Sequence, residues 1–200
     1  MPGDTVGFCR MVDGTREDYD LLARHEAAFV AGTADRIFDH LRRLDAGLAG
    51  YQVSRLQHSL QTATRAWRDG ADADWIVAAL LHDIGDDLAP HNHDTLAATV
   101  IRPYVRDEVS WVVQHHGIFQ LVYYAHHTGG DPNALDKYRG HPSFDAAVAF
   151  CERWDQVSFD PDYDTKPLDF FAHFVREVFV REPWKPAHLR PGEQVPLVAA

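Results

Sequence analysis

Apolar residues recur along most of this chain at intervals of three and four, the spacing that puts side chains on one face of an α-helix. In residues 72–83 this stripe consists of Ile76, Val77, Leu80 and Leu81. In residues 106–117 it consists of Val109, Val112, Val113 and His116. No segment alternates apolar and polar residues for long enough to predict a β-strand. The pattern therefore predicts an all-α fold.

The same spacing, together with glycines at helix ends, delimits the expected helices. They cover residues 16–32, 33–47, 54–70, 72–83, 106–117, 142–155 and 167–180. Residues 129–132, Gly-Gly-Asp-Pro, predict a loop. Residues 183–200 contain four prolines and predict an extended tail. We therefore expect one helical domain over residues 1–182, followed by this tail.

Composition narrows the functional classes. A length of 200 residues suits one domain, and 30 acidic against 19 basic residues give a net charge of −11, which argues against nucleic-acid binding. The two cysteines, Cys9 and Cys151, suggest no disulfide framework and favour a cytoplasmic location. The N-terminus lacks the pattern of a signal peptide, and no apolar run is long enough to cross a membrane. The oligomeric state stays open.

Histidines and aspartates form a candidate metal site. His82 and Asp83 follow an apolar helix, and His58 belongs to the helix before it. A carboxylate such as Asp83 can bridge two ions. Further candidate ligands are His91 or His93, His115 or His116, and Asp155. Imidazole and carboxylate ligands suit iron, manganese or zinc, and the lack of thiolates argues against a structural zinc site. A single histidine on an apolar face is usually a core residue, so the combination carries the prediction.

The arrangement of His58, the His82–Asp83 pair and Asp155 resembles the HD-domain superfamily of helical metalloproteins, most of which are phosphohydrolases. Within it, residues 56–63, LQHSLQTA, resemble the segment around the first histidine of myo-inositol oxygenase and of the phosphonate-cleaving oxygenases. The resemblance covers roughly residues 51–155. It implies a helical bundle with two iron ions, as an Fe(II)/Fe(III) pair. It also implies their ligands: His58, His82, Asp83 and Asp155 for one ion, and Asp83, His93 and His116 for the other.

This resemblance also implies an activity. Asp83, as the bridge, and His116 are assigned to catalysis, and O2 and a small organophosphonate are the expected reactants. Among the phosphonate-cleaving oxygenases, the enzyme whose substrate carries a primary amine has a histidine at the position of Asp86. It has a lysine at the position of Gln120. A carboxylate at residue 86 would suit a cationic tail, and nearby aromatic residues would suit a quaternary ammonium. Those aromatic residues are Tyr51, Phe119, Tyr123, Tyr124 and Tyr163.

The expected substrate is therefore 1-hydroxy-2-(trimethylammonio)ethylphosphonate, cleaved to glycine betaine and phosphate in organophosphonate catabolism. The predicted substrate-binding residues are Asp86, Gln120, Tyr51, Lys137 and Arg139. Arg55 and Arg153 are further candidates for the phosphonate. The alternative for Asp86 is a helix cap or a partner of an arginine.

Two other functions stay open. HD-domain phosphohydrolases and phosphodiesterases use metal-bound water as the nucleophile, and a two-metal phosphodiesterase can use the same six ligands. A one-metal hydrolase needs only four of them and leaves His93 and His116 without a role. A non-catalytic HD module is the third alternative, although such modules often lack ligands that this chain keeps.

Overall fold

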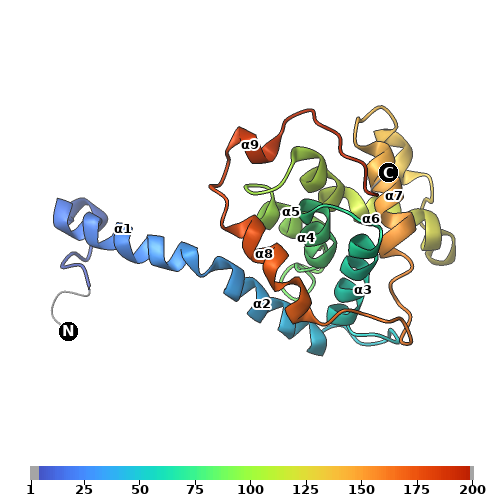
Figure 1. Cartoon of the computed structure of the whole chain (residues 1–200), viewed down its shortest axis with the longest axis horizontal. Helices are drawn as coiled ribbons and strands as arrows, with labels where there is room; N and C mark the ends of the chain where they lie inside the picture. Colours follow the sequence, from blue (N-terminus) through green and yellow to red (C-terminus); the bar gives the residue numbers. More distant parts are fainter. Residues whose placement is uncertain (1–4, 199–200) are drawn as a thin grey trace. The chain divides into compact units, whose positions relative to one another are not determined.

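A computed structural model describes residues 5–198, and within them every regular element is helical, so the all-α prediction is confirmed (Figure 1). The chain divides into two compact units, residues 1–37 and 38–200, and the sequence pattern predicted no boundary there. The predicted limits of 1–182 for the domain and 183–200 for the tail stay a prediction. Among the described helices, none is long and apolar enough to cross a membrane.

The first unit consists of a short 3-10 helix, η1 (Met11–Asp13), and α1 (Arg16–Ala31), which matches the predicted helix. Thr15 begins α1 with a capping box: its hydroxyl accepts a hydrogen bond from the backbone of Asp18, whose carboxylate accepts one from the backbone of Thr15. The ring of Phe8 stacks on Tyr19 at 5.6 Å. No residue of α1 is buried.

The second unit is built around α4 (Ala73–Leu81), which is apolar except for Asp74 and is buried from Asp74 to Leu81. A helix without a polar face belongs in the core, and α4 packs against α3 (Arg55–Arg68), α6 (Asp107–Thr128) and α8 (Ala172–Phe179). Asp72 begins α4 by accepting a hydrogen bond from the backbone of Trp75 at 3.1 Å. The C-cap of this helix is His82, so the His82–Asp83 pair lies directly at the C-terminal end of the buried helix.

The remaining described elements follow in chain order. They are α2 (Thr33–Arg43), which spans the boundary between the units, η2 (Leu44–Ala46), α5 (His93–Ile101), η3 (Ala134–Tyr138), α7 (Phe144–Phe150), η4 (Cys151–Asp155), η5 (Leu168–Phe171) and α9 (Pro186–Leu189). The stretch η4 is π-helical and continues directly from α7. Such π-turns occur frequently at functional sites.

The prediction that a helix ends at Gly117 is wrong. Helix α6 continues to Thr128 and ends at Gly129, which has a left-handed φ of 75°. A glycine inside a helix costs about 1 kcal/mol relative to alanine, and the buried Phe119 and Ala125 beyond it keep the helix against the core. His115 and His116 therefore lie in the middle of a helix, not at its end.

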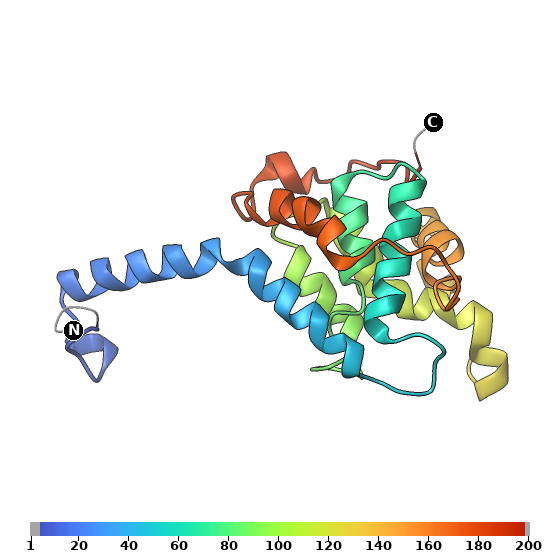
Figure 2. The same cartoon turned by 60° about the horizontal axis from the view of Figure 1, so that its bottom comes forward.

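The C-terminal segment, drawn in red in Figure 2, packs on other helices of the second unit. The carbonyl of Val195 accepts a hydrogen bond from Trp75 Nε1 at 3.3 Å, and its N–H donates to Glu108 at 3.0 Å. Leu197 is buried. These contacts tie the segment to the N-terminal ends of α4 and α6.

Candidate metal centre and adjacent cavity

Six side chains from five segments meet at one place in the second unit. His58 lies in the first turns of α3, His93 opens α5, and His116 lies within α6. His82 and Asp83 follow α4, and Asp155 ends η4. These are the six residues that the family resemblance implied as ligands: His58, His82, Asp83, His93, His116 and Asp155.

The first cluster surrounds one oxygen of Asp83. Its Oδ2 lies 3.2 Å from Nε2 of His58 and 3.2 Å from Nε2 of His82. Asp155 Oδ1 lies 3.2 Å and 3.5 Å from the same two nitrogens. Two ligand atoms held at right angles, each about 2.1 Å from one ion, lie about 3.0 Å apart. The spacing therefore suits one ion held by these four side chains.

The second cluster surrounds the other oxygen of Asp83. Its Oδ1 lies 3.3 Å from Nε2 of His93 and 3.3 Å from Nε2 of His116. The two oxygens of one carboxylate thus face two different pairs of histidines. This arrangement fits two ions with Asp83 between them.

The hydrogen bonds behind the rings make this a donor set for cations. The Nδ1 atoms of His58, His82 and His116 lie 3.0, 2.8 and 2.7 Å from the backbone carbonyls of Ser158, Ala79 and Val113, respectively. A carbonyl can only accept, so each Nδ1 carries the proton and each Nε2 presents a lone pair. Lone pairs and carboxylate oxygens then face one another. Among the described residues, the buried Oδ1 of Asp155 has no hydrogen-bond donor. Positive ions would satisfy all of these atoms.

Without ions, the cluster attracts protons. Burial by itself lowers the pKa of His82, but the carboxylates of Asp83 and Asp155 outweigh it, so this pKa stands well above its usual value. Burial by itself raises the pKa of Asp83, but His82, Arg55 and the other histidines hold it well below its usual range. Protons and metal ions therefore compete for the same atoms.

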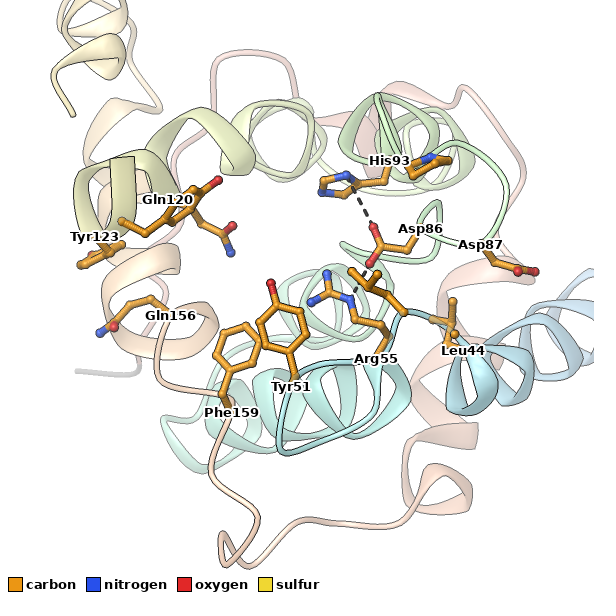
Figure 3. Close-up of a pocket in the computed structure, with 14 residues that line it drawn as sticks. Leu44, Tyr51, Arg55, Asp86, Asp87, His93, Gln120, Tyr123, Gln156 and Phe159 are labelled. Atoms are coloured by element: carbon orange, nitrogen blue, oxygen red, sulfur yellow. Dashed lines mark hydrogen bonds and ion pairs between the residues drawn. The ribbon is translucent and has the colours of Figure 1, made fainter. Parts of the chain in front are cut away.

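A cavity of about 730 Å³ opens beside the second cluster (Figure 3). Of the six candidate ligands, His93 is the one that lines this cavity in the described chain, and its side chain is 24% exposed while that of His116 is 0% exposed. The cavity is of the size that usually binds small molecules. The second cluster is thus the one that a small molecule can reach.

The lining of this cavity differs from side to side (Figure 3). Arg55, Asp86 and His93 form a polar side, whereas Tyr51 and Phe159 form part of an aromatic wall. Two tyrosines of that wall, two glutamines and a second aspartate also line the cavity: Tyr123, Tyr124, Gln120, Gln156 and Asp87. Phe159 stacks on Tyr51 at 5.1 Å and on the ring of His58 at 4.3 Å.

Asp86 lines the cavity, but its carboxylate is engaged. Arg55 donates from Nε to Asp86 Oδ2 at 2.5 Å and from Nη2 to Asp83 Oδ2. Burial by itself lowers the pKa of Arg55, but the two carboxylates outweigh it and raise this pKa. Of the two possibilities left open for Asp86, the structure thus shows the pairing with an arginine. Its binding to substrate stays a prediction.

The structure brings some of the predicted substrate residues to the cavity and places others elsewhere. Tyr51, Asp86 and Gln120 line it, whereas Lys137 and Arg139 do not. Lys137 lies over the ring of Tyr138, and Arg139 pairs with Asp136 at 2.7 Å. The other candidates away from the cavity are Arg153, paired with Asp69; Phe119, in the core; and Tyr163, beneath Arg65 and Arg68.

Three features were missed from the sequence. Phe159 forms part of the wall, Gln156 lines the cavity, and Gln120, already predicted to bind substrate, donates a hydrogen bond to Asp155 Oδ2. Position 159 lies only four residues after Asp155, so an aromatic residue so close to a candidate ligand could have been noticed. The bond from Gln120 joins residues 35 positions apart and depends on the tertiary fold.

The helices of the second unit converge on two histidine–carboxylate clusters that could hold metal ions. Comparison with known proteins agrees: residues 55–143 match the HD domain family, which confirms the predicted resemblance. The match includes His58, His82, Asp83, His93 and His116, and it ends before Asp155.

The chain is also similar to [1-hydroxy-2-(trimethylamino)ethyl]phosphonate dioxygenase (glycine-betaine-forming) from Leisingera caerulea, with 34% identity over 91 residues. This similarity covers 40% of the present chain and 45% of that protein, so the chain matches somewhat less than half of its relative's length.

Proposed function

We propose that this protein is a di-iron oxygenase that cleaves the C–P bond of a 1-hydroxy-2-(trimethylammonio)ethylphosphonate-type substrate. The observation that carries the proposal is the position of the Asp83 carboxylate, whose two oxygens face different histidine pairs next to a cavity. The name of the similar Leisingera caerulea protein supports the substrate class.

The charges at the site favour an anionic substrate. Fe(II) and Fe(III) together carry five positive charges, and the carboxylates of Asp83 and Asp155 remove two, which leaves about three. An oxyanion is therefore attracted to the cavity despite the chain's net charge of −11. The second cluster has three candidate ligands against four in the first, so its ion would have more positions free for substrate.

The chain's own residues would orient the substrate. The phosphonate and hydroxyl groups would lie at the His93 side, and the trimethylammonium group would lie against Tyr51, Phe159 and Tyr124. A quaternary ammonium donates no ordinary hydrogen bond, and aromatic faces attract it by about 1–2 kcal/mol. Asp86 has its charge matched by Arg55 at 2.5 Å and therefore does not repel the phosphonate.

The overall reaction balances with O2 as the only oxidant. The hydroxyl-bearing carbon loses its hydrogen and its bond to phosphorus and becomes the carboxylate of glycine betaine, while phosphorus leaves as phosphate. O2 accepts four electrons, and the products gain its two oxygen atoms. Bound iron would supply the one-electron chemistry that lets O2 react with a closed-shell substrate. The first cluster, with its four buried ligands, would keep solvent away from the ion that it holds.

A two-metal phosphodiesterase is the second candidate, because the same paired clusters can activate water for attack on phosphorus. The two functions differ in their oxidant and in the metal that supports them. The hydrolase would work with manganese in the absence of O2, and it would release an alcohol instead of a carboxylate.

The test combines spectroscopy with product analysis. Protein reconstituted with iron and partly reduced with ascorbate should give an S = 1/2 EPR signal of a coupled Fe(II)/Fe(III) pair that sharpens with the trimethylated substrate. One O2 should be consumed for each glycine betaine and phosphate formed. A protein that lacks the coupled signal and hydrolyses phosphate esters with manganese under anaerobic conditions would have the second function.

A further inference from the structure

His93 differs from the other three histidines in what its Nδ1 atom, the ring nitrogen that points away from Asp83, faces. The Nδ1 atoms of His58, His82 and His116 lie against backbone carbonyls. Nδ1 of His93 instead faces a side chain, Oδ1 of Asp86, at 3.5 Å (Figure 3). The most exposed of the four rings thus has a carboxylate behind it where the others have the main chain.

Asp86 is itself held in place. Its other oxygen, Oδ2, accepts from Arg55 Nε at 2.5 Å, and the second arm of Arg55 reaches Oδ2 of Asp83. The side chains of Arg55 and Asp86 are only 11% and 15% exposed. The contacts therefore form a closed circuit: Asp83 Oδ1 to His93, His93 to Asp86, Asp86 to Arg55, and Arg55 back to Asp83.

We propose that Asp86 is a positioning residue for His93, and that it controls how tightly the cavity-side ion is held. The inference rests on the two-ion site of the proposed function and assigns Asp86 a role other than binding the cationic end of the substrate. A carboxylate that accepts the Nδ1–H of a metal-bound histidine fixes the ring and makes Nε2 a stronger donor. His93 has the greatest need of such support because, within residues 5–198, its Nδ1 has no main-chain partner.

The alternative role for Asp86 makes a different prediction. A receptor for the cationic headgroup would alter the preference between trimethylated and primary-amine substrates and leave metal binding alone. A positioning residue would alter the affinity for the second ion and change turnover of both substrates by the same factor. Metal affinity in the absence of substrate therefore separates the two roles.

The experiment is a titration of the metal-free full chain with Mn(II), in which EPR counts the unbound ion. Wild-type protein should bind two ions, with the second one weaker. We expect Asp86→Asn to lower the affinity for this second ion by roughly 10–100-fold, the usual effect of losing such a partner. The affinity for the first ion should stay unchanged. Asp87→Asn is the matched control: it also lines the cavity, but its contact is with Arg43 at 3.5 Å.

A double-mutant cycle adds a readout that a general loss of charge would not give. His93→Ala should itself weaken the second ion, and Asp86→Asn should add little to it if Asp86 acts through His93. Asp86→Glu, which keeps the charge, should recover part of the affinity. Circular dichroism and melting of each metal-free variant verify folding, and Asp86→Glu serves as the test if Asp86→Asn does not fold.

Equal affinity of Asp86→Asn and wild type for the second Mn(II), or additive losses in the cycle, would overturn the proposal. Binding of a single Mn(II) by wild type would overturn it as well, because His93 would then hold no second ion. Failure of the oxygenase proposal has a different signature: two ions bound and the Asp86 effect present, but no O2 consumed with the phosphonate.

Discussion

His115 and His116 are neighbours in α6, yet their rings have different surroundings. The ring of His115 stacks on Trp111 at 4.3 Å, and its Nδ1 lies 2.7 Å from the carbonyl of Trp111. His116 is fully buried and points its Nε2 at Asp83. Adjacent helical residues point about 100° apart, so only one of the two can face the cluster.

This difference predicts that substitution by alanine affects the metal content differently at the two positions. His116→Ala should lower the metal content from about two ions per chain to about one, because the first cluster keeps its four ligands. His115→Ala should leave two ions bound. Elemental analysis of both variants measures the outcome, and loss of metal from the His115 variant alone would show that the assignment of the ligand is wrong.

Phe159 predicts an effect on substrate choice. Its ring packs between Tyr51 and His58, so Phe159→Ala would remove a central part of the aromatic wall. We expect KM for the trimethylated substrate to rise roughly 5–30-fold, equivalent to about 1–2 kcal/mol, and KM for the primary amine to rise less. Phe170→Ala, whose ring packs on Trp67 away from the cavity, is the control. Equal changes for both substrates would contradict the proposed site for the ammonium group.

The residues of the site differ in how far sequence alone could identify them. The pair His82–Asp83 follows an apolar helix, and His116 continues an apolar stripe, so local pattern was sufficient to nominate both. Arg55 contacts Asp86 across 31 positions, and no local pattern records such a contact. For the same reason, the sequence alone left Asp86 free to bind substrate, and it left Lys137 available although this lysine lies away from the cavity.

At the scale of elements, the turn after α4 sets the position of α5. Gly85 lies in this turn, and a Cβ atom built on it would lie 2.5 Å from the carbonyl oxygen and 2.7 Å from the Cα of His93. Both are main-chain atoms, so no side chain can move aside. The close approach of turn and helix is what brings His93 to Asp83.

Gly85→Ala should therefore push α5 away from the cluster. We expect a loss of about 1–3 kcal/mol in the free energy of unfolding, as for other overpacked sites, together with weaker binding of the second ion. Gly140→Ala is the matched control, because a Cβ atom there would meet no atom of the described part of the chain within 4 Å. Chemical denaturation and Mn(II) titration measure the two effects. A Gly85 variant with unchanged affinity for the second ion would show that α5 adapts to the extra carbon.

Periodicity predicted most of the long helices, but it predicted neither α5 nor the short α9, and it placed two boundaries wrongly. Gly117 looked like a helix end, although α6 passes through it, and a Cβ atom added to this glycine would lie 3.5 Å from the carboxylate of Asp94. Within the predicted helix 142–155, a change to π-helical turns over η4 separates Asp155 from the simple helical register. Both boundaries depend on packing between helices, which single-sequence periodicity does not contain.

At the scale of the whole molecule, metal binding and folding are linked through protons. In the metal-free protein the pKa values of His58 and His82 are raised above 6.5, chiefly by the carboxylates of Asp83 and Asp155, which overcome the effect of burial. A raised pKa in the folded state contributes stability that is full below the unfolded value and is lost as pH rises through the folded value. The pKa values of Asp83 and Asp155 are lowered, so their contribution is lost only in acid.

Metal-free protein should therefore lose stability as pH rises above the usual histidine pKa of about 6.5 and through the raised pKa values of these histidines, because they then give up the protons that compensate the buried carboxylates. Bound ions replace those protons and remove this loss. The difference in Tm between Mn(II)-loaded and chelator-treated protein should widen over this range. His82→Gln, which removes the group with the larger rise in pKa, should flatten the metal-free curve. Parallel melting curves for loaded and metal-free wild type would mean that the cluster holds no such protons and that metal contributes to the fold independently of pH.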